Sequence, residues 1–514
     1  MRAEPGAAKL GHAAFRSLHP RSPVTRTAIR RTKIVATLGP AWDTPDRMRA
    51  LLEAGVDMVR INASHGTPEI RTRWFTDLKQ VLAERQERGI SAAILVDLQG
   101  PRIRVGRLEA PRMLVRGEPV VFAPEDEASA EEIPTTYRGL ARDVAPGSRI
   151  LLDDGLLSVE VAEVRDERVR GVVLYGGELR SNKGINLPGI EVSAPAINDR
   201  DREEVARAIE LGADYIAMSF VRKPEDIEEL RLLVPKPVRI IAKIEKDTAL
   251  LNLRPILLAA DAIMVARGDL GVELPFEEVP LAQKRLIREA NLCNKPVITA
   301  TQMLESMVHA PRPTRAEASD VANAILDGTD AVMLSAETAV GEYPLEAVQA
   351  MVRIAREVEG RRRARGAGGA VDLALGIGAD EGERLGRREG DREATRTENA
   401  IAVATCAAAE LLRSPVIVCF TSSGFTARTV ASYRPSVPIV AVTPEPETFR
   451  QLALIWGVVP VLVEHFPTYE HMLPVARQRL LDRGLAEVGD RVVVTAGVPF
   501  DRSGTTNLVK VETV

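Results

Sequence analysis

Eight short apolar runs alternate with helix-like segments along this chain, and that alternation limits the folds open to it. Between the runs, segments such as DREEVARAIELG place apolar residues three and four apart after an acidic first turn, which is typical of helices. Eight strand–helix units are the number that closes a parallel barrel, so we predict a (β/α)8 TIM barrel. The runs begin at Thr32, Asp57, Ala92, Asp214, Arg239, Ala262, Pro296 and Ala331.

We assign the eight strand–helix units to residues 32–105 and 193–359. The rest of the chain differs from these units in composition and pattern. Residues 106–192 read as short strands with frequent Gly, Pro and acidic turns, which predicts an inserted all-β domain, a β-barrel lid over the barrel mouth. Residues 360–397 are rich in Gly, Arg and Glu and poor in apolar residues, as in a flexible linker. Residues 398–514 return to α/β alternation and predict a C-terminal α/β domain.

Composition narrows the classes of function. The 514 residues carry 68 Lys and Arg against 72 Asp and Glu, a formal charge of −4, which argues against a dedicated nucleic-acid binder. Cys293, Cys406 and Cys419 are widely spaced and form no CxxC pair, so neither a disulfide framework nor a zinc site is indicated, and a reducing cytoplasm fits best. No apolar run reaches the roughly 18 residues that a membrane helix needs.

The first 31 residues form a basic extension with Glu4 as its one acid. One interpretation is an organelle transit peptide, which is Arg-rich and poor in acids. We favour a disordered extension, or an upstream start codon chosen in error, because Pro5, Pro20 and Pro23 would break an amphipathic helix.

Charged residues end two of the apolar runs, RIIAKIE and AIMVARGDLG. Lys243 and Glu245 are two residues apart, so on a strand they share one face. Burying such groups without compensation costs several kcal/mol. With Asp269 from the neighbouring strand end, the two carboxylates suit Mg²⁺, which takes few protein ligands and also binds substrate phosphate. The alternative is a structural ion-pair network that includes Arg267; charge at several barrel strand ends favours a functional site.

A second polar cluster follows the run DMVRINASHG. Arg60, Asn62 and Ser64 are alternate residues and are expected on one strand face, where arginine can bind phosphate and the oxygens can hold a cation. Asp97 ends the next apolar run, and it supports a functional site at the same strand ends. His65 taken alone could be a satisfied core histidine, and its neighbours are what favour a site role.

Other polar positions carry weaker signals. Thr301 is unremarkable alone, since threonine is common in strands. Asp153 and Asp154 indicate a turn rather than a metal site. In the C-terminal region, the hydroxyl-rich loop CFTSSGFTART lies between a strand and a helix, where it could bind phosphate or serve only as a helix cap. It lacks a Walker lysine, which excludes a P-loop NTPase.

Several long motifs occur in one order: TKIVATLGP, RINASHG, DLQGPRIR, NKGINLPG, KIE, MVARGDLG, TATQMLESM, PRPTRAEASDVANA and GTTN. In these motifs, from about Thr32 to the C-terminus, the chain resembles the pyruvate kinase family. The resemblance implies a barrel with a β lid and a C-terminal regulatory domain. It also implies Mg²⁺-dependent phosphoryl transfer from phosphoenolpyruvate to ADP in a cytoplasmic, glycolytic homotetramer, with Mn²⁺ as a substitute metal.

The resemblance also assigns roles to individual residues. Glu245 and Asp269 would hold Mg²⁺, and Lys243 would neutralise charge on the transferring phosphoryl group and the enolate. The catalytic positions are Lys243, Thr301, Arg60, Ser335 and Glu337. The substrate positions are Arg60, Lys243, Ala266, Arg267, Gly268, Asp269, Thr301, Ser219 and Phe220. The nucleotide positions are Asn62, His65, Arg104 and Lys183, and the effector positions are Thr421, Ser422, Ser423 and Thr426.

Two departures from the family pattern carry predictions. Members that require K⁺ place it near residues matching Asn62, Ser64 and Asp97, with a glutamate where this chain has Arg102. Because the arginine supplies a fixed positive charge there, we predict activity without K⁺. The effector loop contains no lysine, which favours a phosphorylated ligand with one phosphate, such as a sugar monophosphate or AMP.

Two other functions compete with phosphoryl transfer. A Mg²⁺-dependent lyase acting on a 2-oxo acid could share a barrel with Glu and Asp ligands, but it needs no nucleotide contacts such as Lys183 on the lid. A degenerate paralogue that only senses metabolites would have lost Lys243, Glu245, Asp269 or Thr301, and all four are present.

Overall fold

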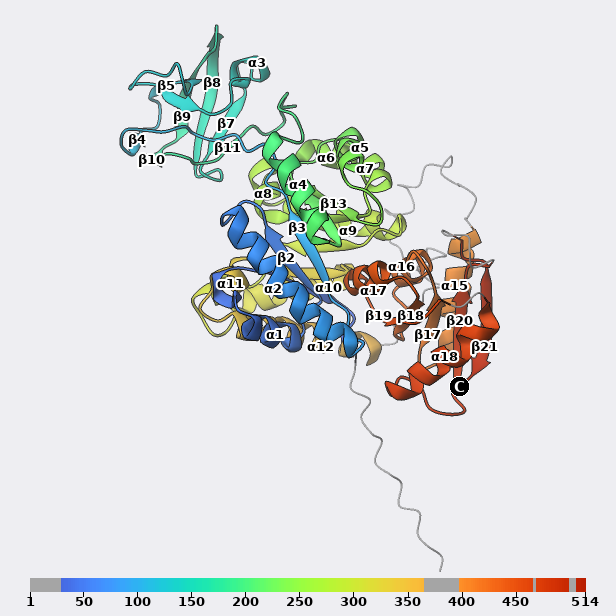
Figure 1. Ribbon diagram of the computed structural model, residues 1–514. Helices are drawn as coiled ribbons and strands as arrows, with labels where there is room; N and C mark the ends of the chain where they lie inside the picture. Colours follow the sequence, from blue (N-terminus) through green and yellow to red (C-terminus); the bar gives the residue numbers. More distant parts are fainter. Residues whose placement is uncertain (1–28, 365–396, 466–467, 499–504) are drawn as a thin grey trace, which may run out of the picture.

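A closed barrel of eight parallel strands forms the centre of the molecule, as predicted (Figure 1). The computed structural model describes residues 29–364, 397–465, 468–498 and 505–514. Neighbouring strands follow the order β1-β16-β15-β14-β13-β12-β3-β2 around the barrel. Each predicted apolar run supplies one strand: β1 (Lys33–Thr37), β2 (Met58–Asn62), β3 (Ala93–Asp97), β12 (Tyr215–Met218), β13 (Arg239–Ile244), β14 (Ala262–Ala266), β15 (Val297–Ala300) and β16 (Ala331–Leu334).

Helices surround the barrel strands. They are α1 (Pro45–Ala54), α2 (Pro68–Glu87), α4 (Asp199–Leu211), α5 (Pro224–Leu233), α6 (Asp247–Leu251), α7 (Leu253–Ala259), α8 (Arg267–Glu273), α9 (Val279–Leu292), α10 (Arg315–Asp327), α11 (Ala336–Ala339) and α12 (Pro344–Ala364). Helix α4 shows why such segments start and stop where they do: Asn198 and Asp201 form a capping box, and Gly212 ends the helix in a left-handed conformation. Among the described residues, no helix combines the length and apolarity that crossing a bilayer requires.

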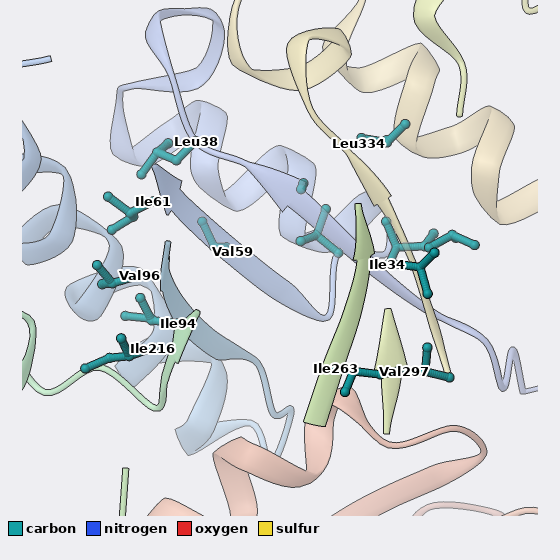
Figure 2. Close-up of a cluster of buried hydrophobic side chains, with 14 of the residues drawn as sticks. Ile34, Leu38, Val59, Ile61, Ile94, Val96, Ile216, Ile263, Val297 and Leu334 are labelled. Carbon is teal, nitrogen blue, oxygen red and sulfur yellow. The ribbon is translucent and has the colours of Figure 1, made fainter. Parts of the chain in front are cut away.

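Both faces of the barrel strands are buried, which explains why the runs are continuously apolar. One set of side chains, including Ile34, Val59 and Ile263, packs outward against the helices (Figure 2). The alternate set, including Val35 and Met264, belongs to a separate apolar cluster. This alternation follows from the two-residue period of a strand.

One predicted strand end is wrong. Strand β14 stops at Ala266, and Arg267 begins helix α8, so Arg267 and Asp269 lie in the first turn of a helix rather than at a strand end. An acidic residue in the first turn is favourable for a helix, which gives a physical reason for the early change.

The inserted region forms two sheets at one end of the barrel (Figure 1). Its elements are β4 (Arg112–Leu114), β5 (Pro119–Pro124), β6 (Ile133–Thr135), α3 (Leu140–Asp143), β7 (Arg149–Leu152), β8 (Leu157–Arg165), β9 (Arg168–Tyr175), β10 (Gly177–Leu179) and β11 (Ile185–Asn186). Strands β11-β7-β8-β9-β5-β6 form one sheet and β10-β4 another, so the described strands do not close into the single β-barrel expected for the lid. Arg104 and Val105 already bridge to Gly184 and Thr135, which places the start of the lid before residue 106.

The C-terminal domain is a five-stranded sheet of order β19-β18-β17-β20-β21, with β21 antiparallel. Its elements are α15 (Thr397–Leu411), β17 (Ile417–Phe420), α16 (Phe425–Ser432), β18 (Ile439–Thr443), α17 (Pro446–Gln451), β19 (Val458–Leu462), α18 (Tyr469–Asp482), β20 (Arg491–Ala496) and β21 (Leu508–Thr513). The sequence did not predict β19 or α18. Pro460 interrupts the first and Pro474 the second, and proline is tolerated in β19 because it is an edge strand.

The predicted boundaries of two irregular segments need correction. Helix α12 continues to Ala364, so the linker predicted from 360 begins inside a helix. At the other end, Arg30 forms an ion pair with Asp57 at 2.7 Å and the backbone N–H of Arg31 donates to Glu359, so the last residues of the predicted extension belong to the folded body. Residues 1–28 and 365–396 of these predicted segments lie outside the described residues.

The C-terminal domain packs against the amino ends of the barrel strands. Asp330, just before β16, forms an ion pair with Arg434 at 3.0 Å, and Asp214, just before β12, forms one with Arg450 at 2.8 Å. The Lys33 amine at the start of β1 donates to the Val458 carbonyl at 2.8 Å. The carboxyl ends of the strands therefore face away from this domain.

Candidate functional site

Lys243 lies at the centre of the polar groups at the carboxyl end of the barrel. Its Nζ is 2.8 Å from the Glu245 carboxylate, 3.3 Å from the Asp97 carboxylate and 2.8 Å from the Ser219 hydroxyl. Burial disfavours the charged amine, but Asp97 and Glu245 outweigh burial and raise the pKa of Lys243. The side chain is therefore a cation held between two carboxylates.

Glu245 and Asp269 have the character of a divalent-cation site. Burial raises the pKa of Glu245; Lys243 opposes this shift and the negative charge of Asp269 adds to it. The second Glu245 oxygen accepts a hydrogen bond from the Phe220 backbone N–H at 2.7 Å. No described residue donates a hydrogen bond to the Asp269 side chain or forms an ion pair with it. A divalent ion would relieve the repulsion between the two carboxylates, so the donor set fits Mg²⁺.

Arg60 is already engaged by groups from neighbouring strands. Its Nε donates to the Asp97 carboxylate at 2.7 Å, and its Nη1 donates to the Thr37 hydroxyl at 3.0 Å. Burial would raise the pKa of Asp97, but Lys243 and Arg60 outweigh burial and lower it. Asp97 thus anchors two cations, which favour its charged form.

Asn62 and Ser64 differ from the predicted shared strand face. Strand β2 ends at Asn62, and Ser64 lies in the turn that follows, with its backbone N–H donating to the Asn62 side chain at 3.0 Å. The turn forms because the asparagine carbonyl can bond the backbone two residues on.

Thr301 sits in a strained loop after β15. Both Thr301 and Gln302 have positive φ angles, of 66° and 53°. The Thr301 hydroxyl accepts a hydrogen bond from the Gly268 N–H at 2.7 Å, and the Arg267 guanidinium donates to the Thr301 carbonyl at 2.7 Å. Arg267 also pairs with Asp320 at 2.7 Å. The Arg267 guanidinium therefore stabilises the loop that carries Thr301.

Ser335 and Glu337 lie behind that loop. The Glu337 carboxylate is fully buried and accepts hydrogen bonds from the backbone N–H groups of Leu304, at 3.1 Å, and Ser335, at 2.6 Å. Burial raises the pKa of Glu337. The carboxyl group links α11 to the segment after β15 and does not line the cavity described next.

A cavity of about 400 Å³ lies between the barrel mouth and the lid. Of the predicted site residues, Arg102, Arg104, Lys183, Phe220 and Asp269 line it, whereas Lys243, Glu245, Arg60 and Thr301 do not. The wall thus combines basic residues with one of the two predicted metal ligands.

On the lid side of this cavity, a predicted nucleotide-binding lysine is paired within the lid, and a predicted turn is confirmed. Lys183 forms an ion pair with Asp153 at 2.8 Å, within the lid. Asp153 and Asp154 both have positive φ angles, of 51° and 53°, and form the turn that the sequence indicated.

Positive charge gathers beside His65. Burial lowers the pKa of His65, and Arg102, Arg60 and Arg104 lower it further. Burial likewise lowers the pKa of Arg104, with Arg102 and Arg200 adding to the shift. Closely spaced arginines repel one another unless an anion joins them, so this region suits a polyphosphate.

In the C-terminal domain, the hydroxyl-rich loop is bonded to its surroundings. Gly424 occupies the N-cap position of α16 with a φ of 75°, and no side chain at that position caps the helix. The Thr426 hydroxyl is buried 2.8 Å from that of Thr506. The Ser423 carbonyl accepts hydrogen bonds from Arg428 at 3.0 Å and from Arg239 of the barrel at 2.9 Å.

Sequence reasoning missed several residues around the site. Thr37 was detectable, since it ends its strand beside Arg60, and Lys246 follows Glu245 directly. Glu273 carries no local signal, and the motif NKGINLPG, which contains Asn186, does not reveal its partner, because the two residues come together only when the lid is placed on the barrel.

Comparison with known proteins covers both the barrel and the C-terminal domain. Residues 29–348 match the family model "Pyruvate kinase, barrel domain" and residues 399–512 match "Pyruvate kinase, alpha/beta domain". A pyruvate kinase of Geobacillus stearothermophilus is 45% identical over 493 residues, covering 94% of this chain and 80% of that protein. One from Agrobacterium vitis is 43% identical over 485 residues, covering 94% and 96%. A crystal structure of a pyruvate kinase from Cryptosporidium parvum aligns with a TM-score of 0.85 at 34% identity, covering 94% and 96%.

Proposed function

The chain belongs to the pyruvate kinase family, and from this premise we propose that it moves the phosphoryl group of phosphoenolpyruvate to ADP, giving pyruvate and ATP. One arrangement carries the proposal: Lys243 is held as a cation beside Glu245, and Glu245 interacts electrostatically with Asp269, whose side chain has no partner among the described residues. The lysine complements the negative charge of a phosphorylated enol, and the two carboxylates complement the positive charge of a divalent ion.

We propose that Glu245 and Asp269 hold Mg²⁺, or Mn²⁺ in its place. When bound there, the ion withdraws charge from the phosphoryl and enolate oxygens of the substrate. Lys243 would neutralise charge on the transferring phosphoryl group, and Arg60, fixed by Asp97, would orient that group.

The other substrate contacts follow the same logic. The backbone of residues 266–269, with Thr301, would bind the substrate carboxylate. Thr301 would assist delivery of a proton to the enolate through water, while Glu337 holds the loop behind it. Ser219 and Phe220 would complete the site through their bonds to Lys243 and Glu245.

ADP would bind on the lid side of the cavity. Arg104 and Lys183 line the cavity and would face the phosphates, with Asn62 and His65 at the barrel edge. Burial, with neighbouring arginines adding to it, lowers the pKa of His65 and of Arg104, and this accumulation of positive charge supports an anionic ligand here.

K⁺ would not be required. After burial, Arg102 is the largest cause of the lowered pKa of both His65 and Arg104, so its charge acts near the place where a monovalent cation would otherwise help. Adding a cation near Asn62, Ser64 and Asp97 would be electrostatically unfavourable, since Asp97 already pairs with Arg60 and Lys243.

We also propose allosteric control through a monophosphate bound by the loop of Thr421, Ser422, Ser423 and Thr426. The hydrogen bond from Arg239 to Ser423 supports this idea, because Arg239 begins the strand that carries Lys243. Thermal shifts with sugar monophosphates, AMP and inorganic phosphate test it: a shift lost in Ser423→Ala supports the site, and none with any probe refutes it.

A cytoplasmic homotetramer is the proposed form. None of the three cysteines forms a disulfide bond within the part of the chain that the structure describes, which supports a reducing compartment. Large apolar side chains are exposed on or beside the neighbouring helices α9 and α10, including Phe276, Leu281 and Leu326, at 85%, 68% and 57%, which supports a subunit interface. Sedimentation analysis reads the state directly.

An assay of pyruvate formation from phosphoenolpyruvate, with and without ADP, tests the main proposal. We expect pyruvate and ATP in equal amounts and only when ADP is present. Turnover of phosphoenolpyruvate without nucleotide, or cleavage of a 2-oxo acid, would instead indicate a lyase.

A further inference from the structure

Glu273, the last residue of α8, is a buried carboxylate that the proposed mechanism does not use. Its side chain is 1% exposed and forms an ion pair with Lys246. The same oxygen, Oε1, accepts a hydrogen bond from the Asn186 side-chain amide at 3.3 Å. The other oxygen, Oε2, is buried without a hydrogen-bond partner among the described residues. A buried carboxylate with one oxygen unsatisfied is costly and calls for an explanation.

The ion pair joins the two segments that carry the proposed metal ligands. Lys246 directly follows Glu245, the ligand after β13. Glu273 lies four residues after Asp269 on α8, so the two carboxylates share one face of that helix. Holding Lys246 against Glu273 therefore limits how far Glu245 and Asp269 can move apart.

The hydrogen bond from Asn186 adds the lid to this pair. Asn186 ends β11, whose partner in the lid sheet is β7. Asn186, Lys246 and Asp269 all line the cavity, whereas Glu273 lies behind its wall. A displacement of the lid away from the barrel would break the 3.3 Å contact, and a closer approach could bring a donor to the unsatisfied oxygen.

We propose that Glu273 is a positioning residue that couples cation binding to lid closure. Its ion pair with Lys246 sets the separation of Glu245 and Asp269. The hydrogen bond that it accepts from Asn186 then makes the position of the lid depend on that separation. The inference rests on the proposed function, because it takes Glu245 and Asp269 as the ligands of the divalent ion. Outer groups that orient ligands typically affect metal affinity by about 10–100-fold.

Two sets of changes separate the two halves of the proposal. Glu273→Gln combined with Lys246→Met removes the ion pair but leaves an amide oxygen for Asn186. Asn186→Ala removes only the contact with the lid, from a cavity-lining position where loss of fold is not expected. Lys284→Met combined with Asp327→Asn is the matched control, since it removes an ion pair on the outside of the same barrel.

Mn²⁺ binding to each full-length protein, measured by electron paramagnetic resonance without substrate, reads the first half. We expect affinity to fall by about 10-fold in the Glu273/Lys246 variant and to stay within about twofold of the original in Asn186→Ala and in the control. Unchanged affinity in the Glu273/Lys246 variant would overturn the positioning role.

Hydrogen–deuterium exchange of residues 183–194, with and without Mn²⁺, reads the second half. We expect Mn²⁺ to slow exchange in the original protein and the control but not in Asn186→Ala, which should also show a raised KM for ADP with little change in kcat. Mn²⁺-dependent protection that survives in Asn186→Ala would refute the coupling. Failure of the proposed metal site looks different: Asp269→Asn would then bind Mn²⁺ as the original protein does.

Discussion

The Arg60 guanidinium lies 2.7 Å from the Asp97 carboxylate, joining the ends of neighbouring strands β2 and β3. Arg60 was predicted to bind substrate phosphate, and Asp97 was predicted at a monovalent-cation position. In the structure Asp97 pairs with both Arg60 and Lys243, so it fixes the arginine that is predicted to bind phosphate and also holds the lysine. The cationic side of the site is therefore built before any ligand arrives.

Replacing Lys243 by Met should abolish most phosphoryl transfer. The change removes a cation aimed at developing charge, so we expect kcat to fall by at least about 10²-fold. Steady-state assays measure this, with circular dichroism to verify folding and Lys284→Met as a surface control. Turnover near the original value in a folded Lys243→Met protein would refute its catalytic role.

Replacing Asp269 by Asn should weaken divalent-ion binding. The amide keeps the size of the side chain but removes a negative charge that would attract the cation. The Mg²⁺ concentration at half-maximal activity should therefore rise by about 10–100-fold. Calorimetric titration with Mn²⁺ gives an independent measure. Equal affinity in both proteins would exclude Asp269 as a ligand.

Exchanging Arg102 for Glu should create dependence on K⁺. The original protein should turn over equally in potassium and tetramethylammonium salts, because the guanidinium supplies the charge. In Arg102→Glu, K⁺ should raise turnover by about tenfold or more, corresponding to roughly 1.4 kcal/mol. Strong stimulation of the original protein by K⁺ would contradict the prediction.

His65 should take up its proton at a lower pH than a free histidine does. Burial and then Arg102, Arg60 and Arg104 lower its pKa below the ordinary value of about 6.5. Because the folded state binds fewer protons than the unfolded state between these two pKa values, His65 lowers stability as pH falls through that window. Titration by NMR should show the low pKa, and Arg102→Gln should raise it; an unchanged value in that variant would exclude the arginine effect.

Replacing Arg434 by Ala should destabilise the contact between the C-terminal domain and the barrel. The buried Arg434 pairs with Asp330 and lies over the Trp456 ring, so its loss leaves a buried carboxylate uncompensated and should cost about 3–5 kcal/mol. Denaturant unfolding measures the loss. The exposed Arg361, paired with Glu357, is the control, and its replacement by Ala should cost less than about 0.5 kcal/mol. Equal effects would refute the prediction.

The strands were predictable because their signal is local. A run such as TKIVATLG is apolar throughout and short, and each of the eight runs became a barrel strand. Strand β19 was not predicted, because Pro460 interrupts its apolar pattern. The proline is tolerated there only because the strand lies at the edge of the sheet. Asp269 was found by its charge but placed on the wrong element, since the change from strand to helix after Ala266 has no strong local marker.

The amino-acid sequence by itself determined the barrel, the added domains and which charged residues gather at the strand ends, because burial periodicity and local charge fix these features. Tertiary structure alone decided how those charges are shared. Arg60, Asp97 and Lys243 come from three different strands, and Glu273 meets Asn186 of the lid across 87 positions of sequence. Such pairings depend on distances in space, which no run of neighbouring residues encodes.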